Sequence, residues 1–301
     1  MKILISGSSG FVGSELVVFL QKLGHEVWRL VRYQDNLSQN AIFWDPQKKI
    51  INPSLLEHFD VVIHLAGENI ASGRWTTEKK RRIFESRVGS TLFLSEVLSK
   101  LKFPPRCFIS ASAIGIYGDK GTSYCNEYTH HGTNFLADVC EQWEAATLPA
   151  KNSKIRTVNL RFGIVLSAKG GALAKMLPIF KWGLGGRLGS GQQYMSWITI
   201  DDLMGVVLFA ATNQTIEGPY NVVSPYPVTN SVFTAILART LGCPAILPVP
   251  AFALNLLMGK EMAGQLLLNS TRVEPSRLTQ AGYAFLFPDL AVALKHLLSG
   301  P

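Results

Sequence analysis

The stretch Ile3–Gly13, written ILISGSSGFVG, leads from a short apolar run through glycines at positions 7, 10 and 13 into a helical pattern. The residues before Gly7 are typical of a buried strand, and apolar residues from Phe11 to Leu23 recur at helical spacing. Glycines at such a turn permit a tight reversal, close approach of the backbone to phosphate, and close packing of helix on strand. The helix N-terminus offers free N–H groups to an anion. We therefore predict that a dinucleotide pyrophosphate binds here. The predicted contacts are Gly7, Ser9, Gly10, Phe11, Val12 and Gly13.

The end of the second predicted strand, at residues 26–31, indicates which dinucleotide binds. An NAD-dependent protein usually carries Asp or Glu there, because a carboxylate accepts hydrogen bonds from the ribose hydroxyls. Here no acid follows until Asp35, whereas Arg32, and with it Arg29, offers a guanidinium that suits a 2′-phosphate. We therefore expect NADP rather than NAD, with Arg32 as a cofactor contact. Arg29 alone can equally be a solvated strand residue.

Strand-like and helix-like segments alternate along the first part of the chain. Apolar runs such as 61–66 and 106–112 are separated by helical patterns, among them a long one from about residue 76 to residue 100. This alternation requires crossover connections between parallel strands. It predicts an α/β fold with a Rossmann-type, doubly wound parallel sheet covered by helices on both faces.

The alternation breaks after Arg161, where glycines crowd the segment 163–191. We expect a dinucleotide-binding domain over residues 1–165 and a smaller α+β, substrate-binding C-terminal domain over residues 166–301. The segment 193–216 is expected to return to the first domain as a strand end and a helix.

Composition and charge exclude several classes of protein. With 47% hydrophobic and 17% charged residues among 301, the chain has an ordinary globular composition. The formal charge of +8 suits a phosphorylated small molecule as well as a nucleic acid, and the sequence has no helical basic stripe with interleaved aromatics. The short basic cluster Lys79–Arg82 is interpreted as a solvated helix face. We expect a small-molecule substrate and neither a nucleic acid nor a membrane as partner.

The cysteines and one uncharged stretch bear on the location of the protein. The cysteines are Cys107, Cys125, Cys140 and Cys243. They form no CxxC pair and no metal-ligand spacing, so we expect buried reduced thiols, no metal site and a cytoplasmic protein. The first residues have no signal-peptide pattern. The stretch Leu241–Met258 has no charged side chain, but prolines interrupt it, so we expect a buried strand, a turn and the start of a core helix.

Several longer motifs go beyond a generic α/β fold. They are GSSGFVG at 7–13, DVVIHLAGENI at 60–70, FISASAIGIYGD at 108–119 and WITIDDL at 197–203. These segments resemble the extended short-chain dehydrogenase/reductases. A narrower resemblance, to the atypical sugar-nucleotide epimerase-like subgroup, comes from RWTTEKK at 74–80, GGALAKMLPIFKWGLGG at 170–186 and RLTQAGYAF at 277–285. Those proteins are relatives of NAD-dependent epimerases and dehydratases with a C-terminal domain of unknown function.

The resemblance implies a serine that hydrogen-bonds the substrate oxygen and a Tyr-x-x-x-Lys pair on the next helix. In the family the tyrosine transfers the proton, while the lysine lowers its pKa and holds the nicotinamide ribose. Ser112 stands at the serine position. The tyrosine position falls on Phe135 or Leu136 and the lysine position on Val139 or Cys140, so the usual pair is absent.

Tyr117 is the substitute that we consider for proton transfer, because it lies in a stretch that lines the substrate cleft of related proteins. The alternative is that it packs beside Gly118. Cys140 is interpreted as a small buried hydrophobe rather than a reactive thiol. The predicted catalytic residues are therefore Ser112 and Tyr117.

The resemblance also implies further cofactor contacts. The residues that would run under the cofactor are Leu65, Ala66 and Gly67. His64 is expected to be a core histidine of the sheet, and Glu68 and Asn69 either contact the cofactor or cap the loop. Arg161, at the carboxyl end of a parallel strand, is expected to anchor a phosphate or a loop.

The loop 184–197 combines glycines with polar and aromatic side chains that can hold a polar or phosphorylated ligand. The expected substrate contacts are Arg187, Gln193, Tyr194 and Trp197. The alternative is a flexible hairpin. Asp201 and Asp202 are expected to cap the helix that follows.

These observations leave two hypotheses of function open. The first is an NADP-dependent oxidoreductase or epimerase that acts on a nucleotide-sugar or a related small polar substrate. The second is an NADP-binding sensor or scaffold without turnover, which would explain why the Tyr/Lys pair is absent while the glycines remain. A homodimer through the long helices of the first domain is implied by the resemblance.

Overall fold

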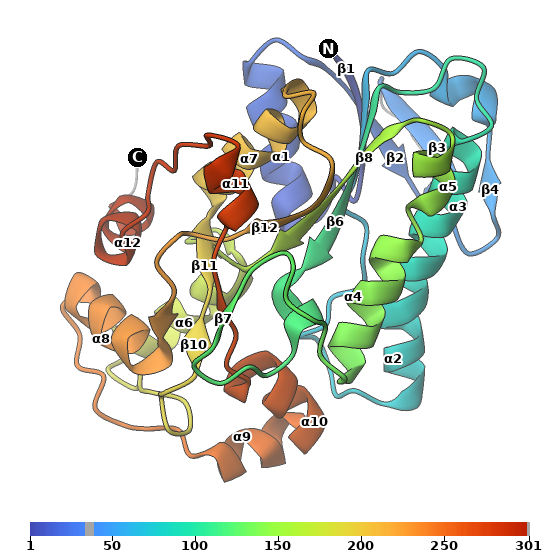
Figure 1. Ribbon diagram of the computed structural model, residues 1–301. Helices are drawn as coiled ribbons and strands as arrows, with labels where there is room; N and C mark the ends of the chain where they lie inside the picture. Colours follow the sequence, from blue (N-terminus) through green and yellow to red (C-terminus); the bar gives the residue numbers. More distant parts are fainter. Residues whose placement is uncertain (34–38, 300–301) are drawn as a thin grey trace.

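The computed structural model describes residues 1–33 and 39–299, and it has the predicted α/β architecture (Figure 1). Its centre is an eight-stranded sheet. In spatial order the strands are β12 (Gly218–Val222), β8 (Arg156–Phe162), β6 (Cys107–Ala113), β5 (Val61–His64), β1 (Lys2–Ser6), β2 (Glu26–Val31), β3 (Ala41–Asp45) and β4 (Ile50–Ile51). The pairings from β12 to β3 are parallel, and β4 pairs antiparallel with β3. The predicted doubly wound parallel sheet is therefore confirmed.

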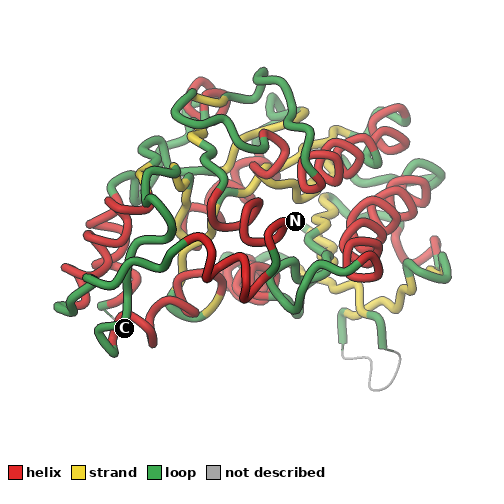
Figure 2. Tube along the Cα trace, turned by 90° about the horizontal axis from the view of Figure 1, so that it is seen from below, coloured by secondary structure: helices red, strands yellow, loops and turns green. Residues whose placement is uncertain are grey.

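Helices cover both faces of the sheet (Figure 2). The first face carries α1 (Phe11–Lys22) and α7 (Ile200–Thr212), and the second carries α3 (Ser90–Leu98), α4 (Phe135–Ala145) and α5 (Leu148–Asn152). The side-chain alternation of β1 divides the core accordingly. Ile3 and Ile5 pack in one cluster with α1 and α7, while Leu4 packs in another with α3.

A second unit lies beside the sheet (Figure 1). Its elements are β9 (Ile164–Ser167), α6 (Gly171–Lys181), β10 (Tyr194–Met195), β11 (Trp197–Thr199), β13 (Val228–Thr229), α8 (Asn230–Leu241), α9 (Ala251–Met258), α10 (Lys260–Ala263), η4 (Gly264–Leu268), β14 (Arg272–Val273), α11 (Ser276–Gln280) and α12 (Leu290–Leu298). The short elements on the sheet side are η1 (Pro53–Leu56), α2 (Thr77–Phe84), η2 (Glu85–Gly89), η3 (Ile114–Tyr117) and β7 (Tyr124–Cys125). Leu173, Phe233 and Leu294 form part of a separate core that joins α6, α8 and α12.

Two expectations about the second unit need correction. Gly218–Val222 forms β12 and pairs with β8, so this segment belongs to the main sheet and not to the C-terminal unit. We keep the division into two domains as a proposal with β12 moved to the first. Of the segment 193–216 that was expected to return to the first domain, α7 packs on the main sheet, whereas β10 and β11 pair with β13 and β9 of the second unit. The stretch Leu241–Met258 contains no buried strand. Prolines leave Ile246 and Leu247 in an exposed loop, 80% and 56% exposed, and α9 presents Leu256 to solvent.

The cysteines lie as expected, with one exception. Cys107, Cys125 and Cys140 are buried, whereas Cys243 is half-buried, and none forms a disulfide with another described residue. In the described part of the chain, no helix is both long and apolar enough to span a membrane.

Asp202 ties the C-terminal segment to α7. Thr199, rather than Asp201 or Asp202, caps this helix, because its hydroxyl accepts the Asp202 N–H at 3.1 Å. The Asp202 carboxylate is 1% exposed and accepts the N–H groups of Leu286 and Phe287 at 2.7 and 3.0 Å. The carboxylate therefore fixes the position of the second unit against the sheet domain.

His64 forms a buried chain of hydrogen bonds below the loop that follows β5. The ring is 0% exposed, with Nδ1 at 2.6 Å from Ser6 Oγ and Nε2 at 3.2 Å from Ser90 Oγ. The Ser90 hydroxyl donates to the Ser86 carbonyl, so it accepts from the ring N–H. Burial lowers the pKa of His64 to about 3, which agrees with the expected neutral core histidine.

This depressed pKa predicts a stability that falls in mild acid. Below pH 6.5 the unfolded chain binds a proton at His64 that the folded chain does not bind. The free energy of unfolding therefore decreases as pH falls from 6.5 toward 3. Between pH 7.5 and 5 the loss from this group should be about 2 kcal/mol. Denaturant titrations at several pH values should show a weaker pH dependence for His64→Asn than for the wild type. Exposed His130→Asn serves as the control; equal slopes for all three proteins would contradict the prediction.

Candidate functional site

The glycine turn between β1 and α1 is built from close backbone contacts. Gly7 has a φ of +69°, and a Cβ there would lie 2.7 Å from the Ala66 backbone nitrogen. A Cβ on Gly13 would overlap the carbonyl oxygen of Gly7. At Gly10 the Gly7 oxygen, at 3.2 Å, is the one described atom within 4 Å of the Cβ position. Packing therefore requires glycine at positions 7 and 13, while Gly10 leaves the outer face of the turn open to a ligand.

The N-terminus of α1 opens at this turn. Ser9 and Gly10 are exposed, and no described side chain hydrogen-bonds the first-turn N–H groups of the helix. The helix has 12 residues and no acid in its first turn, so it presents free donors and the positive end of its dipole. Phe11 and Val12 are half-buried, and the Phe11 ring lies where a Cβ on Gly170 would stand.

Arg32 lies at the carboxyl end of β2, the parallel neighbour of β1. It follows the last strand residue, Val31, and is exposed to solvent. Asp35, the next acidic residue in the sequence, lies outside the described residues. Within the described chain, a cation therefore stands at the strand end from which the ribose 2′ position is recognised in this type of fold.

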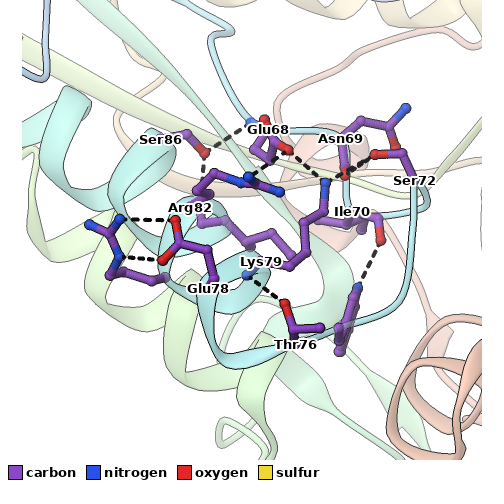
Figure 3. A network of polar contacts seen from close by, with 12 residues as sticks. Glu68, Asn69, Ile70, Ser72, Thr76, Glu78, Lys79, Arg82 and Ser86 are labelled. Carbon is purple, nitrogen blue, oxygen red and sulfur yellow. Dashed lines mark hydrogen bonds and ion pairs between the residues drawn. The ribbon is translucent and has the colours of Figure 1, made fainter.

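The loop 65–76 after β5 passes the glycine turn and is fixed by a buried lysine (Figure 3). Lys79 of α2 is 4% exposed, and its Nζ donates to Glu68 Oε1 at 2.6 Å and to Ser72 Oγ at 3.0 Å. The Glu68 N–H donates to Ser86 Oγ at 2.9 Å. The hydrogen bond from Lys79 holds the pKa of Glu68 below its usual range. Glu68 thus anchors the loop, which is one of the two roles that we considered for it.

Leu65 and Ala66 are half-buried at the start of this loop, and Gly67 is exposed. The Leu65 N–H donates to the carbonyl and to the hydroxyl of Ser6, at 3.2 Å each. The first part of the loop is therefore held against the end of β1, next to the glycine turn.

The basic cluster on α2 is neutralised by carboxylates of the chain. The pairs are Lys79 and Arg82 with Glu68, Lys80 with Glu261, and Arg81 with Glu78. The expectation of a solvated face is correct for Arg81 and Arg82 but wrong for Lys79, which is buried to hold the loop. The pair of Lys80 with Glu261 also connects α2 to α10 of the second unit.

The side chain of Arg161 in β8 forms an ion pair with a carboxylate of the protein itself. Its Nε and Nη2 donate to the two carboxylate oxygens of Glu144 on α4, at 2.7 and 2.9 Å, and its side chain is 3% exposed. Ser112 Oγ donates to the same Glu144 carboxylate at 2.7 Å. We correct the prediction that Arg161 contacts the cofactor, because its strand register places it beside Ser112 and its guanidinium is used within the protein.

Tyr117 is enclosed in the same polar network. The side chain is 0% exposed, and its hydroxyl donates to Asn221 Oδ1 at 2.7 Å and accepts from Arg161 Nη1 at 2.9 Å. Burial raises the pKa of Tyr117 to about 12. We therefore correct the prediction of a proton-transfer role: the hydroxyl is held inside the protein and does not face a cleft.

The register of the sheet assembles this network. Ser112, Arg161 and Asn221 are partners across β6, β8 and β12. Glu127 joins them, because its Oε1 accepts the Asn221 N–H at 3.0 Å, and burial raises the pKa of Glu127. Sequence analysis missed Glu144 and Asn221, since an acid on a helix and an amide in a strand form no motif with partners so distant in the chain.

Cys140 stands at the position of the missing lysine and is 4% exposed. Burial raises the pKa of the Cys140 thiol to about 12, so it remains protonated near neutral pH. It is a small buried side chain of α4, as expected.

The expected substrate contacts are mostly used by the protein itself. Trp197 is 0% exposed in the core of the second unit, and the Gln193 amide, which is buried, donates to the carbonyls of Leu188 and Leu267 at 3.0 and 3.1 Å. These two predictions are corrected: Gln193 holds the loop together, and Trp197 packs in the core. Tyr194 is half-buried in β10, and Arg187 is exposed.

A cavity of about 660 Å³ lies between the segment after η3 and the α10–η4 helices, and the four expected substrate contacts do not line it. Its lining includes Lys120, His131, Asn134, Lys260 and Gln265. Gln265 Oε1 accepts the Leu136 N–H at 3.0 Å, at the start of α4. The cavity therefore borders the helix end that bears the missing tyrosine position. Among the residues that the structure describes, no cluster of His, Cys, Asp and Glu could hold a metal ion.

The buried position of Tyr117 yields a prediction. Tyr117→Phe removes a donor from Asn221 and an acceptor from Arg161, so the free energy of unfolding should fall by about 1–2 kcal/mol. Because the hydroxyl does not face a ligand site, the dissociation constant for NADPH should change less than twofold. Denaturant unfolding and fluorescence titration measure the two quantities, with the exposed Tyr128→Phe as control. Unchanged stability together with lost NADPH binding would contradict this assignment.

Known proteins are similar to this chain in sequence and in fold. An epimerase family protein of Mycobacterium tuberculosis is 38% identical over 299 residues, which cover 99% of this chain and 98% of the relative. The crystal structure of the human epimerase family protein SDR39U1 with NADPH superposes with a TM-score of 0.93 at 32% identity, over 100% of both chains. A nucleoside-diphosphate sugar epimerase from Corynebacterium glutamicum has a TM-score of 0.82 at 36% identity, over 99% of this chain and 58% of the other.

Two family profiles match different parts of the chain. Residues 249–297 match a domain of unknown function, DUF1731. Residues 3–223, which include the glycine turn and the whole main sheet, match the NAD dependent epimerase/dehydratase family. The chain therefore belongs to the NAD dependent epimerase/dehydratase family, as the resemblance in its motifs implied.

Proposed function

We propose that this protein binds NADP and acts as an oxidoreductase or epimerase on a nucleotide-sugar or a related small polar substrate. The observation that carries the proposal is the open face of the glycine turn at the uncapped N-terminus of α1. A side chain at position 7 or 13 would collide with backbone, and a Cβ at the exposed position 10 would lie 3.2 Å from the Gly7 oxygen, so the turn fits a pyrophosphate that lies close to its backbone. The NADPH bound to the human relative supports the same choice of cofactor.

Arg32 supports NADP over NAD. Its exposed guanidinium at the end of β2 can pair with a 2′-phosphate in a charge-assisted, bidentate manner. A 2′-hydroxyl would gain little from the same cation, so the residue favours the phosphorylated cofactor.

When bound, a nicotinamide cofactor supplies hydride transfer. The chain supplies Ser112, whose hydroxyl proton is donated to Glu144, so that acceptor lone pairs are what the serine has left for a substrate. The Glu144 carboxylate accepts two hydrogen bonds from Arg161 and one from Ser112, so the Ser112 proton points to Glu144. Ser112 is 2% exposed, at the end of β6, and the remaining lone pairs of its Oγ can accept from a substrate hydroxyl or amide only where the ligand reaches this strand end. This differs from donation to a substrate carbonyl, and it favours an alcohol at that point.

The cavity beside α4 is the proposed place for the substrate. Its volume of about 660 Å³ is within the range of small-molecule sites, and its lining carries two cations, Lys120 and Lys260, and two acids, Asp119 and Glu261, which suit a polar substrate. The named activity of the Corynebacterium glutamicum relative, on nucleoside-diphosphate sugars, supports a substrate of that class.

The second candidate is an NADP-binding sensor or scaffold without turnover. A specific observation favours it: Tyr117 is buried, and Phe135, Leu136, Val139 and Cys140 carry neither a tyrosine hydroxyl nor a lysine ammonium at the family's positions. Loss of a general acid–base typically lowers a rate by about 10²–10⁴-fold.

The role of Arg32 predicts a selective loss of affinity. Arg32→Met should raise the dissociation constant for NADPH about 10- to 100-fold, because charge-assisted hydrogen bonds to the 2′-phosphate are lost. The constant for NADH should change less than threefold. Fluorescence titration with both cofactors measures this, and Arg106→Met, at an exposed site on β6's amino end, is the control. A parallel loss for NADPH and NADH would argue against the assignment.

A turnover experiment tests the enzyme against the sensor. Sugar nucleotides are incubated with the NADP⁺-loaded protein and small carbonyls with the NADPH-loaded protein, while nicotinamide absorbance and substrate isomerisation are both followed. For an enzyme, Ser112→Ala should lower the rate at least about tenfold, since the serine holds the substrate oxygen. Ser110→Ala, in the same strand and hydrogen-bonded to the Ala111 carbonyl, is the matched control. NADPH binding with no turnover of either kind would support the sensor.

A further inference from the structure

A π-helical turn, η2 (Glu85–Gly89), interrupts the long helical run between α2 and α3. Turns of this kind are rare and occur often at functional sites. Arg87 lies within it and extends to the loop after β5. A Cβ on Gly67 would lie 3.3 Å from the Cζ and Nη2 atoms of Arg87, so glycine at position 67 lets the guanidinium approach the backbone.

Arg87 lacks the ion pair that a half-buried guanidinium normally has. In residues 1–33 and 39–299, no carboxylate oxygen lies within 4.0 Å of it. Its hydrogen bond to the Ile83 carbonyl is long, at 3.3 Å, and its Cζ lies 5.3 Å from the centre of the Trp143 ring. Glu68 interacts with it electrostatically but is bound to Lys79. Burial lowers the pKa of Arg87, and such a cation usually has a hydrogen-bond acceptor as partner.

The strand order indicates which ligand atoms could meet Arg87. The sheet runs β6–β5–β1–β2, with the glycine turn at the end of β1 and Arg32 at the end of β2. A dinucleotide whose pyrophosphate lies at the turn and whose adenosine ribose lies toward β2 must place its other half toward β5 and β6. Arg87 touches the loop at the end of β5, so it stands on the nicotinamide side.

The cation also stands beside the vacant lysine position. The Arg87 guanidinium lies 5.3 Å from the centre of the Trp143 ring, which is one turn along α4 from Val139 and Cys140, the two residues on which the lysine position falls. The positive charge absent from α4 is thus provided from the opposite side, by the π-helical turn.

We propose that Arg87 binds the nicotinamide-side ribose of the cofactor by donating hydrogen bonds to its hydroxyl oxygens. The proposal rests on the proposed NADP binding and adds a binding residue that the sequence motifs do not indicate. Arg87 replaces the lysine of the usual pair in holding the ribose. It does not replace the tyrosine, because a guanidinium does not release a proton near neutral pH.

The test compares two ligands that share the adenosine half. NADPH contains the nicotinamide ribose, and adenosine 2′,5′-bisphosphate lacks it. Arg87→Met should raise the dissociation constant for NADPH about 10- to 100-fold and leave that for the bisphosphate within twofold. Arg87→Lys keeps the charge, so it should lower the affinity for NADPH by a smaller factor and leave the affinity for the bisphosphate unchanged. Arg81→Met, which removes an exposed cation from the same helical run, is the control and should change neither constant.

Each outcome decides the proposal. A raised dissociation constant for NADPH and not for the bisphosphate, in both Arg87 variants and with unchanged midpoints of thermal unfolding, supports it. If NADPH is unaffected, or if both ligands weaken equally, Arg87 acts in packing and the inference is wrong while NADP binding stands. If Arg87→Met does not fold, the lysine variant alone decides by the same criterion. If the wild-type protein binds neither ligand, the proposed function itself fails.

Discussion

The ion pair between Arg161 and Glu144 organises the region where chemistry would take place. It connects β8 to α4 across the face of the sheet, with two hydrogen bonds of 2.7 and 2.9 Å in a buried setting. Because the guanidinium holds the Glu144 carboxylate in place, the Ser112 proton has a fixed acceptor. The same guanidinium holds the Tyr117 hydroxyl, which reaches on to β12. Removal of either charge would leave the other buried without a partner, which is strongly destabilising.

The positive charge of the chain is distributed in a way that the net value does not reveal. The cluster on α2 is neutralised by acids, and its buried member, Lys79, fixes the loop after β5. Arg32 is exposed at a strand end, and Arg87 is half-buried without an ion pair among the described residues. Arg32 and Arg87 therefore lie on the two sides of the glycine turn. This arrangement suits a dinucleotide better than it suits an extended polyanion, which needs a continuous basic surface.

The residues that would bind a dinucleotide are present in this chain, whereas the Tyr/Lys pair that transfers a proton in related proteins is absent from its sequence. The elements that would hold a dinucleotide are complete: an open turn, an uncapped helix and a cation at the end of β2. The tyrosine position of related proteins carries Phe135 or Leu136, and Tyr117, the substitute considered from the sequence, is enclosed in the protein. A family with one fold can therefore contain members with quite different chemistry, since the reaction depends on a few side chains and not on the sheet.

The sequence by itself determined the sheet, the glycine turn and the family. These depend on local patterns: apolar runs with period two or 3.6, and glycines at positions where a Cβ would collide with neighbouring backbone. The sequence also located Arg32, because a strand end is a local feature. What it did not determine was the direction of polar side chains. Arg161 and Tyr117 had the right chemistry for a site, but tertiary packing directed both into the interior. Their partners, Glu144 and Asn221, come from other elements, as does the contact of Arg87 with Gly67. A hydrogen bond depends on distance and angle in space, and only the packing of helices on the sheet fixes these for residues far apart in the chain.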